Sequence, residues 1–440
     1  MSVAAYLNKR VDNAPLVLFR ICFGFLLAWQ SFYDIYDDKI YVLYVEPKHH
    51  FPFLGFEWVH PLPGYGMYIY HIVMGILGLC ICAGLLYRYS LTAFTLLWGG
   101  LYVMQKTSYN NHHYLIILLC LLMLVVPANR YASIDCRLKP ALKKYSMPQW
   151  CRVIIIVQVF VLYFFAGVAK LYPDWMDGSH MGLVFKAHQN PAWLFITQNH
   201  WFHLFISWGG IVFDLLIIPA LLYNRTRLVA AAATVFFHLF NFYTLNIGIF
   251  PFLSIAFLPF FFSPEKTRQL VFPKKPPVPA DEATHAATAK NNAIIKYILF
   301  PYVIIQLFLP LRPYLIEGNV FYTEEGSRLA WRMKLTLKSG RVTFRVAERP
   351  QGKQKIFNIS NLYTPFQIYK MSTKPDMIWQ AAQLIKQEYA KKGKDVSVYV
   401  TAYVKLNNHP ERLIIDPKAD LAAAKWDYFF HNEWILLNED

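Results

Sequence analysis

One lysine at the end of an apolar stretch is the first candidate for chemistry in this chain. Residues 151–170 read CRVIIIVQVFVLYFFAGVAK, and this run ends with the ammonium of Lys170. A charge at the membrane end of such a segment is unfavourable unless it reaches the interface, finds a partner or loses its proton. Lys170 is therefore a candidate general base. The alternative interpretation is an interfacial anchor lysine, which is common at helix ends.

Amide and imidazole side chains are expected near the same membrane face as Lys170. Asn111 and His112 lie in the turn that enters an apolar stretch, and His238 and Asn241 are three residues apart, on one helical face. Polar groups at this depth need hydrogen-bond partners, so they can simply join helices to one another. Alternatively, a desolvated lysine can deprotonate an acidic, lipid-soluble molecule such as a hydroquinone, while Asn and His orient its oxygen or stabilise the anion.

Other chemistries have weaker support in the sequence. No metal site is expected, because His112 and His113 diverge on a helix, no carboxylate joins them at ligand spacing and the cysteines lie elsewhere. The sequence near these positions also has no Gly-rich phosphate loop, nucleophile elbow or paired carboxylate. The lysine, amide and imidazole set is thus the main candidate site.

The composition predicts an integral membrane protein. Of the 440 residues, 56% are hydrophobic and 17% aromatic, which is more apolar surface than a soluble protein of this size can cover. We expect a polytopic α-helical bundle of about nine spans, several of them shorter than the ~20 residues that cross a bilayer without strain. The predicted spans cover residues 15–33, 65–87, 90–105, 113–126, 151–170, 201–223, 228–243, 246–262 and 293–310.

The net charge of +16 could suggest binding to nucleic acid, but the positions of the basic residues along the chain indicate a membrane orientation instead. Most of the positive excess lies in alternate short connections between spans, such as 130–152 and 266–275, whereas the opposite connections are acidic or sparse in charge. By the positive-inside rule, the N-terminus is cytoplasmic and the segment after the ninth span lies outside. No cleavable signal peptide is evident, because the first apolar run leads straight into a span.

Changes of pattern divide the chain into four parts. These are a transmembrane bundle with the active site at 1–262, a cytoplasmic linker at 263–292, the last span at 293–310, and an outward strand-rich α+β domain at 311–440. Within the outward domain, alternation of apolar and polar residues predicts strands, and helical spacing predicts a helix. The predicted strands cover 331–337, 341–347 and 396–406, and the helix covers 376–392.

Ordered motifs over most of the chain resemble the vitamin K-dependent gamma-glutamyl carboxylases, within the wider group that shares the horizontally transferred transmembrane domain. Each motif is weak alone, and their order makes the resemblance specific. The motifs are Tyr109-Asn110-Asn111-His112, Val161 to Leu171 with Asp174-Trp175, Trp208-Gly209-Gly210 with Asp214, Phe237-His238, Ile247 to Phe250, Ser263-Pro264-Glu265, Gln306 to Pro310, Ile415-Asp416-Pro417 and Ala424-Lys425-Trp426.

The resemblance implies a coupled reaction of the carbon–carbon lyase class. The family uses O2 to convert vitamin K hydroquinone to the epoxide, and the strong base formed on the way removes a γ-proton from a peptide glutamate, which then takes up CO2. The mapping implies that Lys170 deprotonates the hydroquinone, that His112 stabilises the intermediate and that Asn111 contacts the quinone oxygen. His238 and Asn241 would line the quinone pocket. The implied partners are a glutamate-containing peptide or protein and the lipid bilayer.

The chain departs from the animal enzymes in two ways. It ends at Asp440, where those enzymes continue, so recognition of a propeptide like theirs does not follow from the resemblance. Ala169 stands where the animal motif has a second lysine, so Lys170 has one fewer positive neighbour. The compact length and the absence of a cysteine framework resemble a bacterial member, which predicts an inner-membrane protein with its C-terminal domain outside.

Two other functions stay open from the sequence. A quinol oxygenase without carboxylation forms epoxide but adds no mass to a peptide, and a quinone- or lipid-binding membrane protein turns nothing over. Substitution of Lys170 by Ala separates the binder from the enzymes, because losing a general base lowers a rate ~100- to 10,000-fold. The protein substrate and the oligomeric state do not follow from the sequence.

Overall fold

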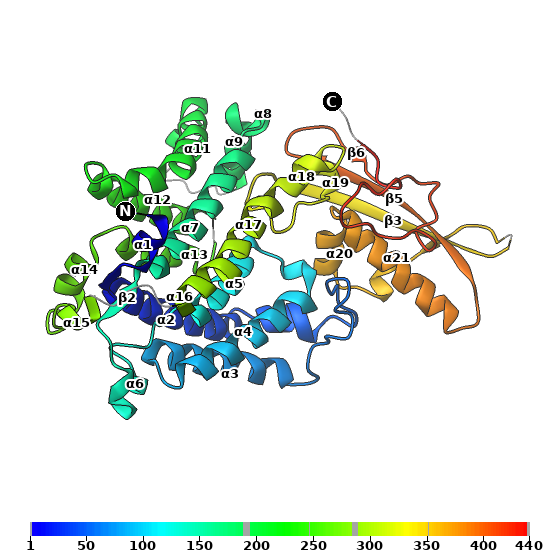
Figure 1. The fold of residues 1–440 in the computed structure, drawn as a ribbon. Helices are drawn as coiled ribbons and strands as arrows, with labels where there is room; N and C mark the ends of the chain where they lie inside the picture. The colour runs from blue at the N-terminus through cyan, green and yellow to red at the C-terminus, as the bar shows by residue number, and fades with distance from the viewer. Residues whose placement is uncertain (1, 188–193, 246, 284–288, 351, 438–440) are drawn as a thin grey trace.

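The computed structural model describes residues 2–187, 194–245, 247–283, 289–350 and 352–437. These residues form a bundle of helices, with a region that contains a four-stranded sheet at one end of it (Figure 1). One apolar core holds the bundle together, and a second core lies between the sheet and its helices. We refer to residues 316–437 as the C-terminal region.

Helices occupy the segments that the sequence predicts as spans. They are α2 (Ala14–Tyr36), α3 (Gly66–Ala83), α4 (Tyr87–Met104), α5 (Asn111–Val125), α7 (Gln149–Ala169), α11 (His200–Leu222), α12 (Arg227–Leu245), α13 (Phe250–Ala256) and α17 (Phe300–Phe308). Five stretches in the described part of the chain are long and apolar enough to cross a membrane: Ala14–Tyr36, Gly66–Ala83, Gln149–Ala169, His200–Leu222 and Asn291–Leu315. Nine spans are not confirmed, since α5 and α13, with 15 and 7 residues, fall below the ~20 that span a bilayer.

Small residues let the helices of the bundle approach closely. A Cβ atom added at Gly24 of α2 would lie 2.3 Å from the backbone N of Cys82, and one at Gly78 of α3 would lie 2.6 Å from the backbone N of Ala28. Such contacts are typical of helix pairs in membranes, where small residues allow backbones to meet. The close contact fixes α2 and α3 along much of their length and thereby fixes the end of α2 that carries Asp34.

The segment predicted as a linker is packed on the bundle in its described part. It begins with α14 (Pro264–Val271). The ammonium of Lys275 is buried and pairs with Asp12, and buried Glu282 accepts a hydrogen bond of 2.8 Å from the Ser146 hydroxyl. Residues 284–288 of the predicted linker lie outside the described residues. Buried charges thus hold this proline-rich segment where its composition alone predicts only a connection.

The C-terminal region confirms two of the predicted strands and the predicted helix. An antiparallel sheet has the order β4-β3-β5-β6, from β3 (Lys338–Glu348), β4 (Lys355–Phe357), β5 (Val396–Leu406) and β6 (Arg412–Leu413). Residues 341–347 lie inside β3, 396–406 form β5, and the helix at 376–392 is α21 (Pro375–Ala390). Buried alternate positions of β5, such as Val398 and Val400, face the core that α21 covers.

Residues 331–337, by contrast, are not a strand, and this prediction was wrong. Trp331 and Lys334 have positive φ values of 56° and 50°, which interrupt an extended chain. Trp331 is fully buried in the core of the bundle, where its ring lies 5.1 Å from that of Tyr114. Trp331 and Met333 pack in the core of the bundle instead of in a sheet, and Leu337 is exposed. We call residues 328–335 the inserted segment.

Candidate functional site

Lys170 and Asp214 form a buried ion pair between two helices. Lys170 caps the C-terminus of α7, and Asp214 lies in the middle of α11. The Lys170 Nζ and Asp214 Oδ2 atoms are 2.5 Å apart, and the side chains are 12% and 6% exposed. The helices meet closely at Gly167, where an added Cβ would lie 2.7 Å from the Leu215 side chain. The charge of Lys170 is therefore compensated by an ion pair with Asp214.

Trp175 covers the ammonium of Lys170. It belongs to the short helix α8 (Pro173–Met176), and its ring centroid lies 5.1 Å from Lys170 Nζ. The indole Nε1 donates a hydrogen bond of 3.0 Å to the backbone carbonyl of Ser207 in α11, which fixes the orientation of the ring. An aromatic face attracts a cation without neutralising it. Asp214 therefore supplies the negative charge opposite Lys170, and Trp175 shields the pair.

Two of the predicted histidines meet across an aromatic ring. Asn110 caps α5 by accepting a hydrogen bond from the backbone of His112, and the His112 ring stacks on Phe250 with centroids 4.1 Å apart. The rings of Phe250 and His238 are nearly perpendicular, with centroids 5.6 Å apart, and His238 Nε2 shares a hydrogen bond of 2.6 Å with the Tyr163 hydroxyl. The Nδ1 atoms of both histidines are buried and have no hydrogen-bond partner among the described residues.

The two predicted asparagines are placed differently. Both ends of the Asn111 amide form hydrogen bonds. Its Oδ1 accepts one from the Tyr109 hydroxyl at 3.1 Å, and its Nδ2 donates one to the Arg332 carbonyl at 2.8 Å. Asn111 thus holds the inserted segment on α5. Asn241 is half-buried on α12, one turn beyond His238, and its side chain makes no hydrogen bond within the described residues.

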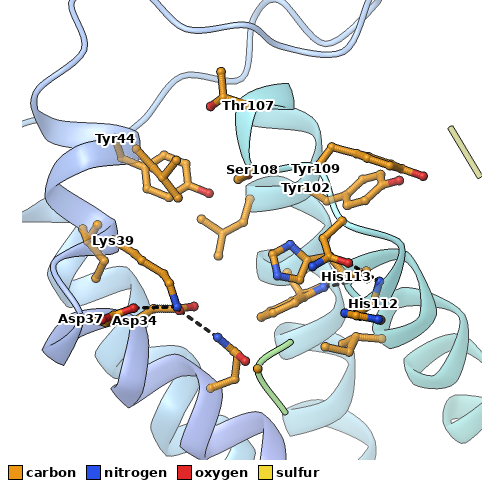
Figure 2. Close-up of a pocket in the computed structure, with 18 of the residues that line it drawn as sticks. Asp34, Asp37, Lys39, Tyr44, Tyr102, Thr107, Ser108, Tyr109, His112 and His113 are labelled. Carbon is orange, nitrogen blue, oxygen red and sulfur yellow. Dashed lines mark hydrogen bonds and ion pairs between the residues drawn. The ribbon is translucent and has the colours of Figure 1, made fainter. Parts of the chain in front are cut away.

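A cavity of about 450 Å³ lies beside His112, at the end of the bundle that meets the C-terminal region. In Figure 2, His112 and His113 of α5 stand on one side of it, and Asp34 of α2 stands on the other with Asp37 and Lys39, which follow the helix. Lys170 and Asp214 are not among its lining residues. The structure therefore places His112 on the cavity and the Lys170–Asp214 pair apart from it.

Two models of known protein families match this chain. The model of the HTTM domain matches residues 8–265, and the model of the vitamin K-dependent gamma-carboxylase lumenal domain matches residues 291–440. The chain belongs to the vitamin K-dependent gamma-glutamyl carboxylase family. No solved structure matches it. It is a carboxylase-like membrane protein, and its family implies vitamin K as a co-substrate and a glutamate-containing substrate.

The cavity of this carboxylase-family chain suits a small, flat ligand. Its volume falls in the range of roughly 300–1,000 Å³ that small-molecule sites occupy, and Trp98, Tyr102 and Phe250 line it beside polar groups. The unpartnered Nδ1 of His112 is able to hydrogen-bond a phenolic oxygen in either tautomer. These residues therefore fit a hydroquinone. In the described part of the chain, no group of three or more His, Cys, Asp or Glu residues is arranged to hold a metal ion.

Sequence reasoning missed two carboxylates in this carboxylase-family chain. Asp214 appeared in a motif but received no role, although an ionisable residue inside an apolar run is itself a sign of function. Asp34 directly follows the predicted span 15–33 and was given no role. In the structure, Gln30 Nε2 donates to Asp34 at 2.8 Å, and Lys39 Nζ lies 2.9 Å from Asp37 and 3.5 Å from Asp34.

A second buried charge cluster joins the C-terminal region of this family member to its bundle. Lys106 Nζ lies 2.5 Å from Asp376, and Arg328 donates two hydrogen bonds to the same carboxylate at 2.6 and 3.1 Å. Burial lowers the pKa of Lys106 to about 8. Burial also opposes ionisation of Asp376, but Arg328 and Lys106 outweigh it and hold the pKa of that carboxyl well below its usual range. The cluster fixes the inserted segment over α5.

Proposed function

We propose that this chain is a vitamin K-dependent gamma-glutamyl carboxylase that couples hydroquinone epoxidation to carboxylation of peptide glutamate. The observation that carries the proposal is the buried Lys170–Asp214 pair in a chain of this family. Placing an ionisable side chain inside a membrane costs free energy, so ionisable residues found there usually serve a function. Oxygenation of the bound hydroquinone supplies the strong base that removes the γ-proton of the glutamate.

Lys170 and Asp214 act together as the base in this proposal. A protonated ammonium cannot accept another proton, so a proton first passes from Lys170 Nζ to Asp214 Oδ2 across 2.5 Å. The resulting amine then takes a phenolic proton, which leaves a charged lysine beside a neutral carboxylic acid. One proton is gained by the pair in total, and Asp214 stores it. The separation of 2.5 Å allows a proton to move between the two side chains. The pair does not line the cavity beside His112, so the proposal requires the bound hydroquinone to bring its phenolic oxygen within hydrogen-bond reach of Lys170 Nζ.

The remaining predicted residues take positioning or binding roles. We assign His112 Nδ1 as a hydrogen-bond partner for the quinone oxygen, because it is buried, unpartnered and belongs to a cavity-lining residue. Asn111 acts on the quinone indirectly, by holding Arg332 and the inserted segment in place. His238, oriented by Tyr163, packs against the cavity-lining ring of Phe250, which supports a place for His238 beside the quinone pocket. We keep Asn241, one turn further along α12, in the same role.

We also propose nine membrane spans with the N-terminus in the cytoplasm and residues 311–440 outside, in the inner membrane of a bacterium. The presence of a helix in each of the nine predicted spans, over the described residues, supports the count. The alternation of basic and acidic connections supports the orientation. Site-directed labelling of single cysteines introduced at Lys144 and Lys394 tests it, because only the second is then reached by an impermeant reagent added outside.

Purified protein with vitamin K hydroquinone, O2, labelled bicarbonate and a glutamate-rich peptide tests the activity. Wild type is expected to form epoxide and to fix label, and Lys170→Ala to do neither. Epoxide without label on any glutamate peptide would favour the quinol oxygenase. If binding of hydroquinone is demonstrated and no epoxide forms, the protein is a binder and the proposal is wrong.

A further inference from the structure

The cavity is lined by two lysines whose surroundings differ. The ammonium of Lys39 is compensated by Asp37 at 2.9 Å and Asp34 at 3.5 Å. Lys370 comes from the C-terminal region, and within the described residues no carboxylate lies at ion-pair distance from it. Its ammonium instead lies 5.4 and 5.7 Å from the ring centroids of Phe366 and Tyr369. One cavity therefore contains a neutralised cation and an uncompensated one.

Lys370 is held firmly at this position. It lies in the last turn of α20 (Pro365–Met371), four residues after Phe366, so both side chains share the helical face that lines the cavity. A capping box formed by Thr364 and Gln367 closes the start of this helix. Gln367 Nε2 also donates a hydrogen bond of 2.7 Å to the His49 carbonyl of the bundle. The helix therefore presents Lys370 to the cavity from a fixed support.

The surroundings of Lys370 are basic. Burial lowers the pKa of Lys370, and the positive charges of Lys374 and Lys334 lower it further. Lys374 has Glu324 at 3.7 Å, whereas Lys334 is exposed on the inserted segment and acts electrostatically on both Lys370 and His112. Clustered, partly desolvated cations favour an anion as ligand, and a carboxylate gives them charge-assisted hydrogen bonds.

We propose that Lys370 binds the side-chain carboxylate of the substrate glutamate, with Lys334 adding to the positive potential around it. This inference rests on the proposed function and names the group that selects its peptide. His112 lines the same cavity, so a glutamate held by Lys370 enters the space that suits the quinone. The site distinguishes glutamyl from glutaminyl peptides, because an amide carries no charge for the lysine to neutralise.

Binding of two fluorescent peptides, one with glutamate and one with glutamine at the same positions, tests the proposal on the full-length protein in nanodiscs. Wild type is expected to prefer the glutamate peptide roughly 10-fold, the lower end for a hydrogen bond to a charged group. Lys370→Gln should remove this preference, and Lys370→Arg should keep most of it. Lys391→Gln, which removes an exposed lysine paired with Glu388 at 2.5 Å, should leave it unchanged.

Peptide binding is measured without turnover. A failure of the role of Lys370 can therefore be distinguished from a failure of the proposed carboxylase activity. A folded Lys370→Gln protein that keeps the wild-type preference would overturn the role of Lys370, whatever the activity. If the preference depends on Lys370 and the enzyme assay fixes no label, the carboxylate site stands and the carboxylase proposal falls. When both assays succeed, Lys370→Gln should also raise the KM for the peptide while hydroquinone binding is unchanged.

Discussion

Two of the buried lysine–aspartate pairs in the described part of the chain have the same separation and different surroundings. Lys170–Asp214 joins two helices of the bundle, and Lys106–Asp376 joins the bundle to the C-terminal region, each at 2.5 Å. Asp376 has a second cation, Arg328, at 2.6 Å, whereas Lys170 is the one cation paired with Asp214 among the described residues. Two cations lock Asp376 in the ionised form, so it cannot accept a proton.

The difference shows that a buried ion pair is not by itself a mark of catalysis. In the one-to-one pair, a proton can move between Nζ and Oδ2 without changing the total charge, and the resulting neutral pair no longer carries the desolvation cost of two buried ions. In the pair with an extra guanidinium, the same transfer would leave the Arg328 charge without its partner. We therefore assign chemistry to Lys170–Asp214 and attachment of the C-terminal region to Lys106–Asp376–Arg328.

The largest effect is expected from Lys170→Arg, which keeps the positive charge and removes the base. A guanidinium stays protonated in proteins, so Asp214 remains paired while proton transfer stops. Epoxide formation should fall ~100- to 10,000-fold with little change in thermal stability. Activity close to wild type would show that Lys170 acts only through its charge.

Replacing Asp214 by Asn removes the atom that stores the proton. We expect a loss of ~100-fold at neutral pH, and the remaining activity should rise with pH because only a lysine that is already neutral can then accept the phenolic proton. The pH–rate profile measured beside wild type checks this. A profile with the wild-type shape would mean that Asp214 merely holds the lysine in position.

Asp376→Asn should affect stability more than chemistry. The substitution leaves Lys106 and Arg328 buried without their counter-charge, and breaking a buried pair in this way destabilises by about 3–5 kcal/mol. Denaturant unfolding followed by tryptophan fluorescence measures the change. Asp395→Asn is the matched control, because it breaks an exposed contact with Arg349 and should change stability little. An equal effect of the two variants would contradict the attachment role.

A smaller effect is expected from pH at Lys106. Its folded-state pKa of about 8 lies below the usual lysine value of 10.5, so the unfolded chain binds more protons between these values and stability rises with pH in this window. The rise is at most on the order of 3 kcal/mol and should be missing in Lys106→Met. Denaturation midpoints at pH 8 and pH 10 compare the two proteins, and an equal rise in both would contradict the assignment.

The sequence predicted features that depend on a single segment, but it did not predict the partners of the two lysines. The unfavourable position of Lys170 was evident from its apolar run, but its partner depends on how α7 and α11 meet at Gly167, which no local pattern encodes. Lys106 attracted attention only through its charge, because Asp376 is distant in sequence. Neighbours within one segment were thus easier to predict than contacts between segments.

The inserted segment illustrates a second limit of the sequence. Its apolar residues alternate as in a strand, yet Trp331 packs on Tyr114 in the bundle. A period of two indicates that alternate residues are buried and does not say which surface buries them. Strands β3 and β5 were predictable because their alternating residues pack within the C-terminal region itself. The role of Asn111 was hidden for the same reason, since its amide binds Arg332 of the inserted segment.

The most direct test of the account asks where the phenolic proton goes. Infrared difference spectra recorded when vitamin K hydroquinone is mixed with the protein without oxygen report protonation of carboxyl groups. We predict a new carboxylic acid band in wild type that is absent in both Asp214→Asn and Lys170→Arg. Ionisation of the hydroquinone without this band, or the same band in Asp214→Asn, would contradict the claim that Lys170 and Asp214 together form the base.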